Sequence, residues 1–183
     1  MNDRDARKRF EALWDLHYAD LFSYALRRLG DEHGASDAAA ETFLVAWRRF
    51  DAMPDDARPW LFGVARRVVA NQRRGEQRRE ALLARVASDR QAPTGEAAGD
   101  RLADLVGAFN RLKASDREVL SLVVWEELKP REAARVLGIP AARFSVRLHR
   151  AKQRLRKEIE RGGQEEVGGE ETEPPVEVGA PPA

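Results

Sequence analysis

The sequence contains no cysteine and very little lysine. Of its 32 basic side chains, 27 are arginine and only five are lysine. Without cysteine the chain forms no disulfide and offers no thiolate for catalysis or for metal binding. No apolar run approaches the roughly 20 residues that cross a bilayer, and the first ten residues lack the apolar core of a signal peptide. We therefore expect a cytoplasmic protein without membrane insertion.

Charge of both signs is abundant, but it is unevenly placed. The formal net charge is only +1, yet the chain from Gly162 onward holds six glutamates and no lysine or arginine. Residues 1–161 therefore carry 32 basic and 25 acidic side chains, a net charge of +7. A basic body of this kind indicates a polyanionic partner, although a GC-rich genome also favours arginine over lysine.

The apolar periodicity is helical nearly throughout, and no alternating strand pattern of useful length occurs. One helical face runs from Phe10 to Ala25. A second helix is expected after Ser36, whose hydroxyl suits an N-cap, and a third has Pro59 in its first turn. The third helix runs toward Arg79 and carries the densest basic cluster, seven arginines within residues 58–79. That cluster fits either a solvated helix face or a nucleic-acid contact.

A composition break divides the chain into two parts. Residues 87–101 are small and polar and contain one proline and two glycines, which is typical of a flexible linker. Beyond it a short helix is expected over 102–112, and Ser115 to Glu118 matches a capping box that opens another. We predict an all-α fold of two small helical domains. The predicted segments are a first domain over 1–83, a linker over 84–101, a second domain over 102–161 and a disordered acidic tail over 162–183.

The second domain contains a helix-turn-helix pattern. Pro130 begins a short helix, Gly138 is the expected left-handed residue that ends it, and Pro140 precedes the next helix. That next helix has two neighbouring stripes at helical spacing. The apolar stripe is Phe144, Leu148, Ala151 and Leu155, and the arginine stripe is Arg143, Arg147, Arg150 and Arg154. Such a helix can dock on its domain and face a DNA duplex, although a solvated basic face on an ordinary helical hairpin remains the alternative.

The two parts together resemble an extracytoplasmic-function (ECF) sigma factor of the sigma-70 family, which has only domains 2 and 4. The stretch "LWDLHYADLFSYALRRLGDEHGASDAAAETFLVAWRRFDAMPDDARPWLFGVARRVVANQRRG" is similar to domain 2. The stretch "LADLVGAFNRLKASDREVLSLVVWEELKPREAARVLGIPAARFSVRLHRAKQRLR" is similar to domain 4. The resemblance implies a promoter-directing subunit of RNA polymerase that assists melting of the −10 element. It implies no enzyme activity of its own, no catalytic residue, no cofactor and no metal.

The resemblance also assigns roles to residues of the first domain. The residues that would dock on the basic clamp helices of the polymerase largest subunit are Asp37, Glu41, Thr42 and Trp47. The loop residues that would capture a flipped base of the −10 element are Met53, Asp55, Asp56 and Arg58. The helical residues that would contact the −10 strand are Arg66, Arg67, Asn71, Arg73 and Arg74.

In the second domain the resemblance places the helix that follows Pro140 in the major groove of the −35 element. The residues expected at bases or phosphates there are Arg131, Arg143, Ser145, Arg147, Arg150 and Arg154. His149, on the same helix, either packs or touches phosphate. The implied partners are the polymerase core, through its clamp helices and its flap, promoter DNA and an anti-sigma factor.

Two departures from the family pattern stand out. The family usually has a bulky apolar pair and a glutamine where this chain has Ala38-Ala39-Ala40, which removes one expected polymerase contact. Lys129 occupies the position before the helix-turn-helix where a serine usually caps, and its side chain has no acceptor for a cap. The loss of such a cap costs about 1 kcal/mol.

Other interpretations of the sequence remain open. A dimeric helix-turn-helix regulator accounts for residues 129–159 but leaves residues 36–79 unexplained. An enzyme could be built around Glu41, Asp55, Asp56 and the three histidines, but these residues follow no H-E-x-x-H, P-loop or G-x-S-x-G spacing. The acidic tail either folds back on the basic DNA-binding faces or serves as a solubilising terminus.

Overall fold

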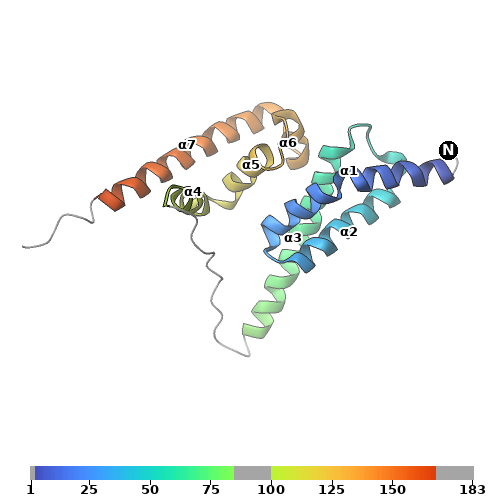
Figure 1. The fold of residues 1–183 in the computed structure, drawn as a ribbon, viewed down its shortest axis with the longest axis horizontal. Helices are drawn as coiled ribbons and strands as arrows, with labels where there is room; N and C mark the ends of the chain where they lie inside the picture. The colour runs from blue at the N-terminus through green and yellow to red at the C-terminus, as the bar shows by residue number, and fades with distance from the viewer. Residues whose placement is uncertain (1–2, 85–99, 168–183) are drawn as a thin grey trace, which may run out of the picture.

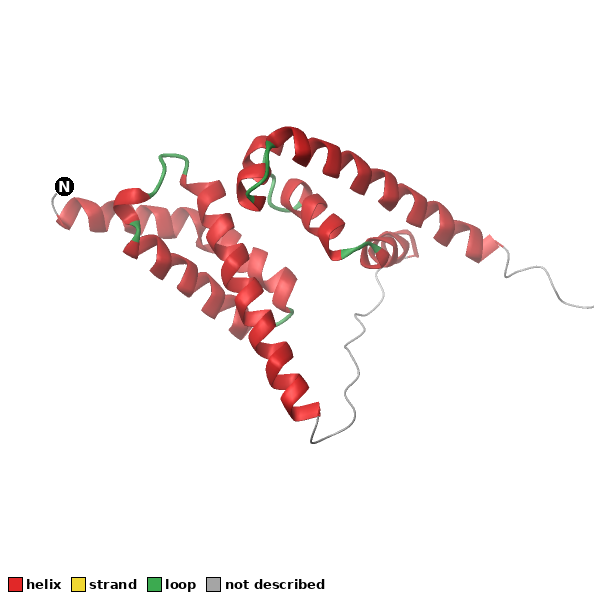
Figure 2. Cartoon of the chain, turned by 180° about the vertical axis from the view of Figure 1, so that it is seen from behind, coloured by secondary structure: helices red, strands yellow, loops and turns green. Residues whose placement is uncertain are grey.

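The computed structural model describes residues 3–84 and 100–167, and these residues are helical apart from short connections. Figures 1 and 2 show the arrangement from two sides. The elements in chain order are α1 (Asp3–Leu29), α2 (Glu32–Arg48), the 3-10 turn η1 (Phe50–Ala52), α3 (Ala57–Ala84), α4 (Asp100–Arg111), α5 (Ala114–Val124), α6 (Pro130–Leu137) and α7 (Ala141–Val167). The described ranges hold no strand, so the all-α prediction is confirmed. The predicted linker falls largely in residues 85–99, outside the described part.

The first three helices form one bundle around an aromatic centre. Tyr24 of α1 and Phe43 of α2 are fully buried, as is Leu61 of α3. The Trp14 and Phe43 ring centroids are 4.5 Å apart, and Phe10 meets Phe43 edge to face. Aromatic pairs in these geometries add to the free energy gained by burial alone, so they fix α2 against α1.

The start of α2 differs from the prediction. Gly30, with φ of +83°, ends α1, and Asp31 caps α2: its Oδ1 accepts a hydrogen bond from the Gly34 N–H at 2.6 Å. Ser36 therefore lies inside the helix, and its predicted role as N-cap is wrong. An ionised aspartate at this position is stabilised by the helix dipole as well as by the hydrogen bond.

The predicted capping box at residues 115–118 is also wrong. Helix α5 begins at Ala114 after Lys113, which makes no side-chain cap. The Glu118 side chain instead accepts hydrogen bonds from Tyr24 and Arg28 of α1. The local capping pattern was misleading because a hydrogen bond from a charged guanidinium stabilises a carboxylate more than a hydrogen bond from one backbone N–H does.

Helices α4 to α7 form the second bundle, and the helix-turn-helix within it is as expected. Pro130 begins α6, and Gly138 ends it in the left-handed conformation with φ of +65°. The Lys129 side chain indeed makes no cap, but its backbone N–H donates to Glu132 Oε2 at 2.8 Å. Helix α7 continues to Val167, so the segment predicted as a tail from Gly162 begins as helix.

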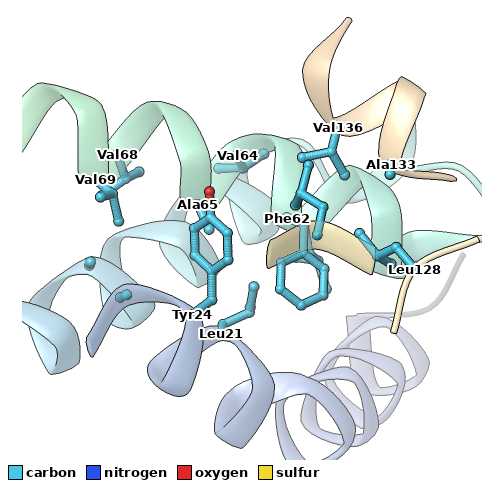
Figure 3. Packing of buried hydrophobic residues seen from close by; sticks show 14 of the residues in the cluster. Leu21, Tyr24, Phe62, Val64, Ala65, Val68, Val69, Leu128, Ala133 and Val136 are labelled. Atoms are coloured by element: carbon cyan, nitrogen blue, oxygen red, sulfur yellow. The ribbon is translucent and has the colours of Figure 1, made fainter. Parts of the chain in front are cut away.

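The two bundles pack against each other rather than standing apart. Helix α3 contacts α6, and the buried residues of both bundles belong to one hydrophobic cluster. Figure 3 shows the Phe62 ring among Leu21 and Tyr24 of α1 and Leu128 and Val136 of the second bundle. Within the described ranges no helix has an apolar stretch long enough to cross a membrane.

Buried His17 makes the stability of the first bundle depend on pH. Burial lowers the pKa of His17 below its ordinary 6.5; Asp20 opposes this and Arg58 adds to it. The folded state therefore holds the ring neutral, and this contribution to stability is complete above about pH 6.5 and lost as the pH falls below it. We expect the thermal midpoint to drop between pH 7.5 and 5.5, and His17→Gln to reduce that drop. His33→Gln changes an exposed histidine and should leave the drop as large as in the unaltered protein. Equal pH profiles of all three proteins would contradict the role assigned to His17.

Candidate nucleic-acid interface

Helix α7 has one buried face and one arginine face. Phe144 and Ala151 are fully buried and hold the helix on α5 and α6. Arg143, Arg147 and Arg150 are exposed on the other side. Guanidinium groups in a row can bind phosphates or the acceptor edge of guanine, so this face is suited to a DNA duplex.

The other predicted residues around α7 divide into free and engaged side chains. Arg131, on α6, is exposed, and His149 lies with its Nε2 3.1 Å from Gln153 Nε2 on the surface of α7. The Ser145 hydroxyl donates to the Ala141 carbonyl at 3.1 Å. Arg154 donates to both Asp116 carboxylate oxygens, at 2.7 and 2.9 Å, and thereby fixes α7 to α5.

Helix α3 has a second arginine face. The five predicted −10 residues on this helix are all exposed: Arg66, Arg67, Asn71, Arg73 and Arg74. On the opposite side Leu61 and Phe62 are buried, and Trp60 is half-buried. The mixed aromatic and basic stretch of the sequence therefore resolves into an apolar side in the core and a basic side in solvent.

The two arginine faces meet at one groove. Its volume is about 710 Å³, and it lies between α3 and the second bundle. The α3 residues Arg66, Arg67, Asn71, Arg73 and Arg74 line it together with Arg147 of α7. Residues expected at two different DNA elements thus share a single hollow in this conformation.

The loop that precedes α3 is tied down by ion pairs. Arg58 Nη2 lies 3.1 Å from Asp20 Oδ2, and Asp56 Oδ2 lies 2.5 Å from Arg135 Nη2 on α6. Met53 is half-buried and packs against the core, whereas Asp55 is exposed. Three of the four predicted base-capturing residues are therefore engaged within the protein.

Helix α2 presents a mixed acidic and apolar outer face. Asp37 and Glu41 are exposed, and Trp47 is 43% exposed. Thr42 is fully buried, and its hydroxyl donates to the Ala38 carbonyl at 2.7 Å, so its side chain acts inside the bundle in this structure. Sequence reasoning missed Leu44, which is 47% exposed on this same face. Counting positions three and four residues apart from Glu41 and Trp47 could have found it.

A larger groove lies beside the first, and it is more apolar. Its volume is about 860 Å³; exposed Leu105, Val106, Val124 and Trp125 line one side and Arg27 belongs to the other.

The described residues contain no group of three or more His, Asp or Glu side chains that could hold a metal ion.

Comparison with protein families matches both halves of the chain. Residues 13–79 match sigma-70 region 2, and residues 102–155 match sigma-70 region 4. The ECF RNA polymerase sigma factor SigL of Mycobacterium tuberculosis is 36% identical over 156 residues, which cover 79% of this chain and 85% of SigL. The chain belongs to the ECF sigma factors. It directs RNA polymerase in transcription initiation, is not an enzyme, and binds DNA through its region 4 helix-turn-helix.

Other similar proteins agree with this assignment. SigM of Bacillus subtilis is 27% identical over 85% of this sigma factor and 98% of its own length. Among solved structures, CnrH in complex with the cytosolic domain of CnrY matches with a TM-score of 0.57 at 25% identity, over 82% of this chain and 87% of CnrH. The fold is also similar to that of sigma factor RpoE from Bartonella quintana, solved with the anti-sigma factor NepR, with a TM-score of 0.63 at 24% identity, over 84% of this chain and 98% of RpoE.

Membership in the family removes the competing interpretations. The helix-turn-helix belongs to a two-region sigma factor, so the dimeric-regulator hypothesis is wrong, and region 2 accounts for residues 36–79. The enzyme hypothesis is wrong as well. Glu41 and Asp55 are exposed side chains of a polymerase-binding protein, and Asp56 forms a surface ion pair.

The left-handed turn between α6 and α7 yields a stability prediction. A Cβ added at Gly138 or at Gly75 meets nothing within 4 Å, so space limits neither substitution and the backbone conformation decides the outcome. Gly138→Ala must place a side chain at positive φ and should cost about 1–2 kcal/mol. Gly75→Ala, inside α3, should stabilise by about 0.8–1 kcal/mol through helix propensity. Denaturant unfolding of the two variants checks this, and changes of the same sign would contradict it.

Proposed function

We propose that this sigma factor reads the −35 element with the arginine face of α7. The observation that carries the proposal is the division of α7 into a buried face, with Phe144 and Ala151, and an exposed face, with Arg143, Arg147 and Arg150. A recognition helix must be fixed on its domain and still present free donors to the groove. Arg154, at the edge of the arginine face, does both. Its guanidinium pairs with Asp116 and so holds α7 on α5, and its side chain remains half-exposed, where it can meet the backbone of a duplex.

The exposed basic side of α3 is the proposed reader of the −10 element. Arg66, Arg67 and Asn71 lie on consecutive turns of a helix that is anchored by buried Leu61 and Phe62. Arginines next to an unpaired strand bind its phosphates and can stack on its bases. The loop with Met53 and Asp55 then receives a base taken out of the stack, a step that costs a few kcal/mol and needs a fixed pocket.

Paired substitutions test the two readers in run-off transcription with bacterial core polymerase on a genomic promoter library. Arg143→Ala with Arg147→Ala should lower initiation at −35-dependent promoters about tenfold or more, because one good bidentate base contact is worth about 1–3 kcal/mol. Arg66→Ala with Arg67→Ala should instead reduce melting of the −10 region, followed by the reactivity of unpaired thymines to permanganate.

The matched control removes the same charge from a different side of α7. Lys152 and Arg156 are exposed and lie outside the arginine stripe. Lys152→Ala with Arg156→Ala should change initiation little. If the control pair loses as much activity as the Arg143 and Arg147 pair, α7 contributes only general electrostatic attraction and the proposed reading of the −35 element is wrong.

The outer face of α2 is the proposed docking surface for the polymerase clamp helices. Asp37, Glu41, Leu44 and Trp47 recur on this face at helical spacing, and all are exposed. Trp47 is steadied by Phe10, whose ring centroid is 5.0 Å away, so it offers a rigid aromatic surface flanked by carboxylates. Ala38 and Ala39 are buried, and only Ala40 of the three alanines reaches the surface. The departure from the family pattern therefore removes one polar side chain from the surface.

Charge reversal tests the docking surface. Glu41→Lys should weaken binding to immobilised core polymerase severalfold, because it places a cation against a basic partner. Glu32→Lys makes the same charge change on the opposite side of α2, where Glu32 is exposed, and should bind as the unaltered protein does. Equal binding of both variants in a pull-down, with unchanged circular dichroism, would remove Glu41 from the interface.

A further inference from the structure

Val146 is an apolar side chain on the outer surface of α7. It is the sixth residue of a helix that begins at Ala141, and it is 49% exposed. It lies two residues after buried Phe144 and two residues before Leu148, which packs against the core. Because an α-helix turns by about 100° per residue, Val146 lies about 180° around the helix from the midpoint of these two side chains. Its side chain therefore points directly away from the domain.

The residues around Val146 belong to the basic face of α7. On a helix surface the neighbours of a residue are those three and four positions away. For Val146 they are Arg143 and Arg150 on one side and Ala142 and His149 on the other, and all four are exposed. Residues 141–157 contain no aspartate or glutamate that would repel phosphates. Val146 is thus an apolar point within a surface of hydrogen-bond donors.

The fold gains little from a valine at this position. Among the described residues, Leu148 and Leu155 of α7 are partly buried against the hydrophobic cluster, and Val146 is not one of this set. Valine is also a weaker helix former than alanine, because its branched Cβ restricts χ1. The same restriction holds the two methyl groups of Val146 in one preferred rotamer, so a contact with DNA would cost little side-chain entropy. The position suits a rigid apolar contact outside the protein.

The major groove of DNA offers one apolar partner at a base edge. Thymine presents its C5-methyl group there, whereas the other edge groups are hydrogen-bond donors and acceptors. Cytosine presents an amino donor, which valine cannot accept, and a donor covered by an apolar side chain loses its hydrogen bond to water. The first residues of a recognition helix are those that contact base edges. A valine among them favours a T·A pair over a C·G pair.

We propose that Val146 selects one thymine of the −35 element through its C5-methyl group. Arg143, Arg147 and Arg150 bind phosphates or guanine edges around it, and Val146 supplies a contact that a hydrogen-bond donor cannot make. The proposal rests on the assignment of α7 as the reader of the −35 element under the proposed function. It adds the base that one position of that element prefers.

Deoxyuridine tests the contact, because it lacks only the methyl group of thymine. Run-off transcription on the genomic promoter library first supplies the −35 sequence, and each of its thymines, on either strand, is then replaced in turn. The thymine and deoxyuridine promoters compete in one reaction with core polymerase and the full chain, and their transcripts differ in length. We expect the unaltered protein to favour thymine about fourfold at one position, the effect of removing one methyl group from water.

Substitutions at Val146 show whether the protein reads that methyl group. Val146→Ala should abolish the preference at this position, and Val146→Thr, which keeps one of the two methyl groups, should retain part of it. Val124→Ala is the matched control, since Val124 is 62% exposed on α5, and it should leave the preference unchanged. Val146→Ala should not lower the thermal midpoint, because alanine is the better helix former. A lower midpoint would give Val146 a packing role and contradict its position in solvent.

Three results would overturn the proposal. A thymine preference that persists in Val146→Ala would mean that the methyl group acts through the shape of the DNA. The other two are a −35 element in which no deoxyuridine changes initiation, and promoters that share no A·T pair in this element.

The double substitution Arg143→Ala with Arg147→Ala separates this failure from that of the proposed function. If the arginine pair lowers initiation while deoxyuridine has no effect, α7 still reads the −35 element and only the role of Val146 is wrong. If neither change has an effect, the assignment of α7 to this element is itself wrong.

Discussion

The buried carboxylate of Glu126 is the constraint around which the two halves of this sigma factor are arranged. Moving a charge out of water costs several kcal/mol unless opposite charges and hydrogen bonds replace the lost hydration. Arg27 and Arg28, adjacent on α1, supply that replacement. Arg28 continues the network to Glu118 and stacks on Tyr24, whose phenol is buried and has its pKa raised by that burial. The apolar contact of Phe62 with the second half lies directly beside these charges.

This arrangement places the same residues under two demands. Arg66 is proposed to contact the −10 strand, yet its Nε lies 3.9 Å from Glu118. Asp56, in the loop proposed to capture a base, pairs with Arg135 of region 4. Both pairs are partly exposed, and exposed ion pairs contribute little to stability, so breaking them costs little free energy. The better buried pairs of Glu126 join the two halves, while the weaker pairs engage side chains that are proposed to contact DNA.

Much of the fold followed from local pattern. The spacing of Phe144, Ala151 and the arginines between them predicted both faces of α7, and Gly138 ends α6 in the conformation that only glycine adopts without strain. The errors arose at helix starts, where a polar side chain matched a capping pattern but does not cap the helix. Ser36 and Glu118 both fit capping patterns, but Asp31 took the first cap and α1 took Glu118. Local propensity cannot register a partner that lies 90 residues away in the chain.

By itself the sequence determined the helical class, the order of the two regions, the family and the identity of the arginine faces. These properties depend on residues a few positions apart, and helical periodicity makes such relations readable. Only the tertiary structure decided that the two halves close on each other, that Glu126 is buried between them, and that Arg66 and Arg147 share one groove. Those features depend on which side chains meet across distant helices, where burial and the cost of removing charge from water determine the outcome.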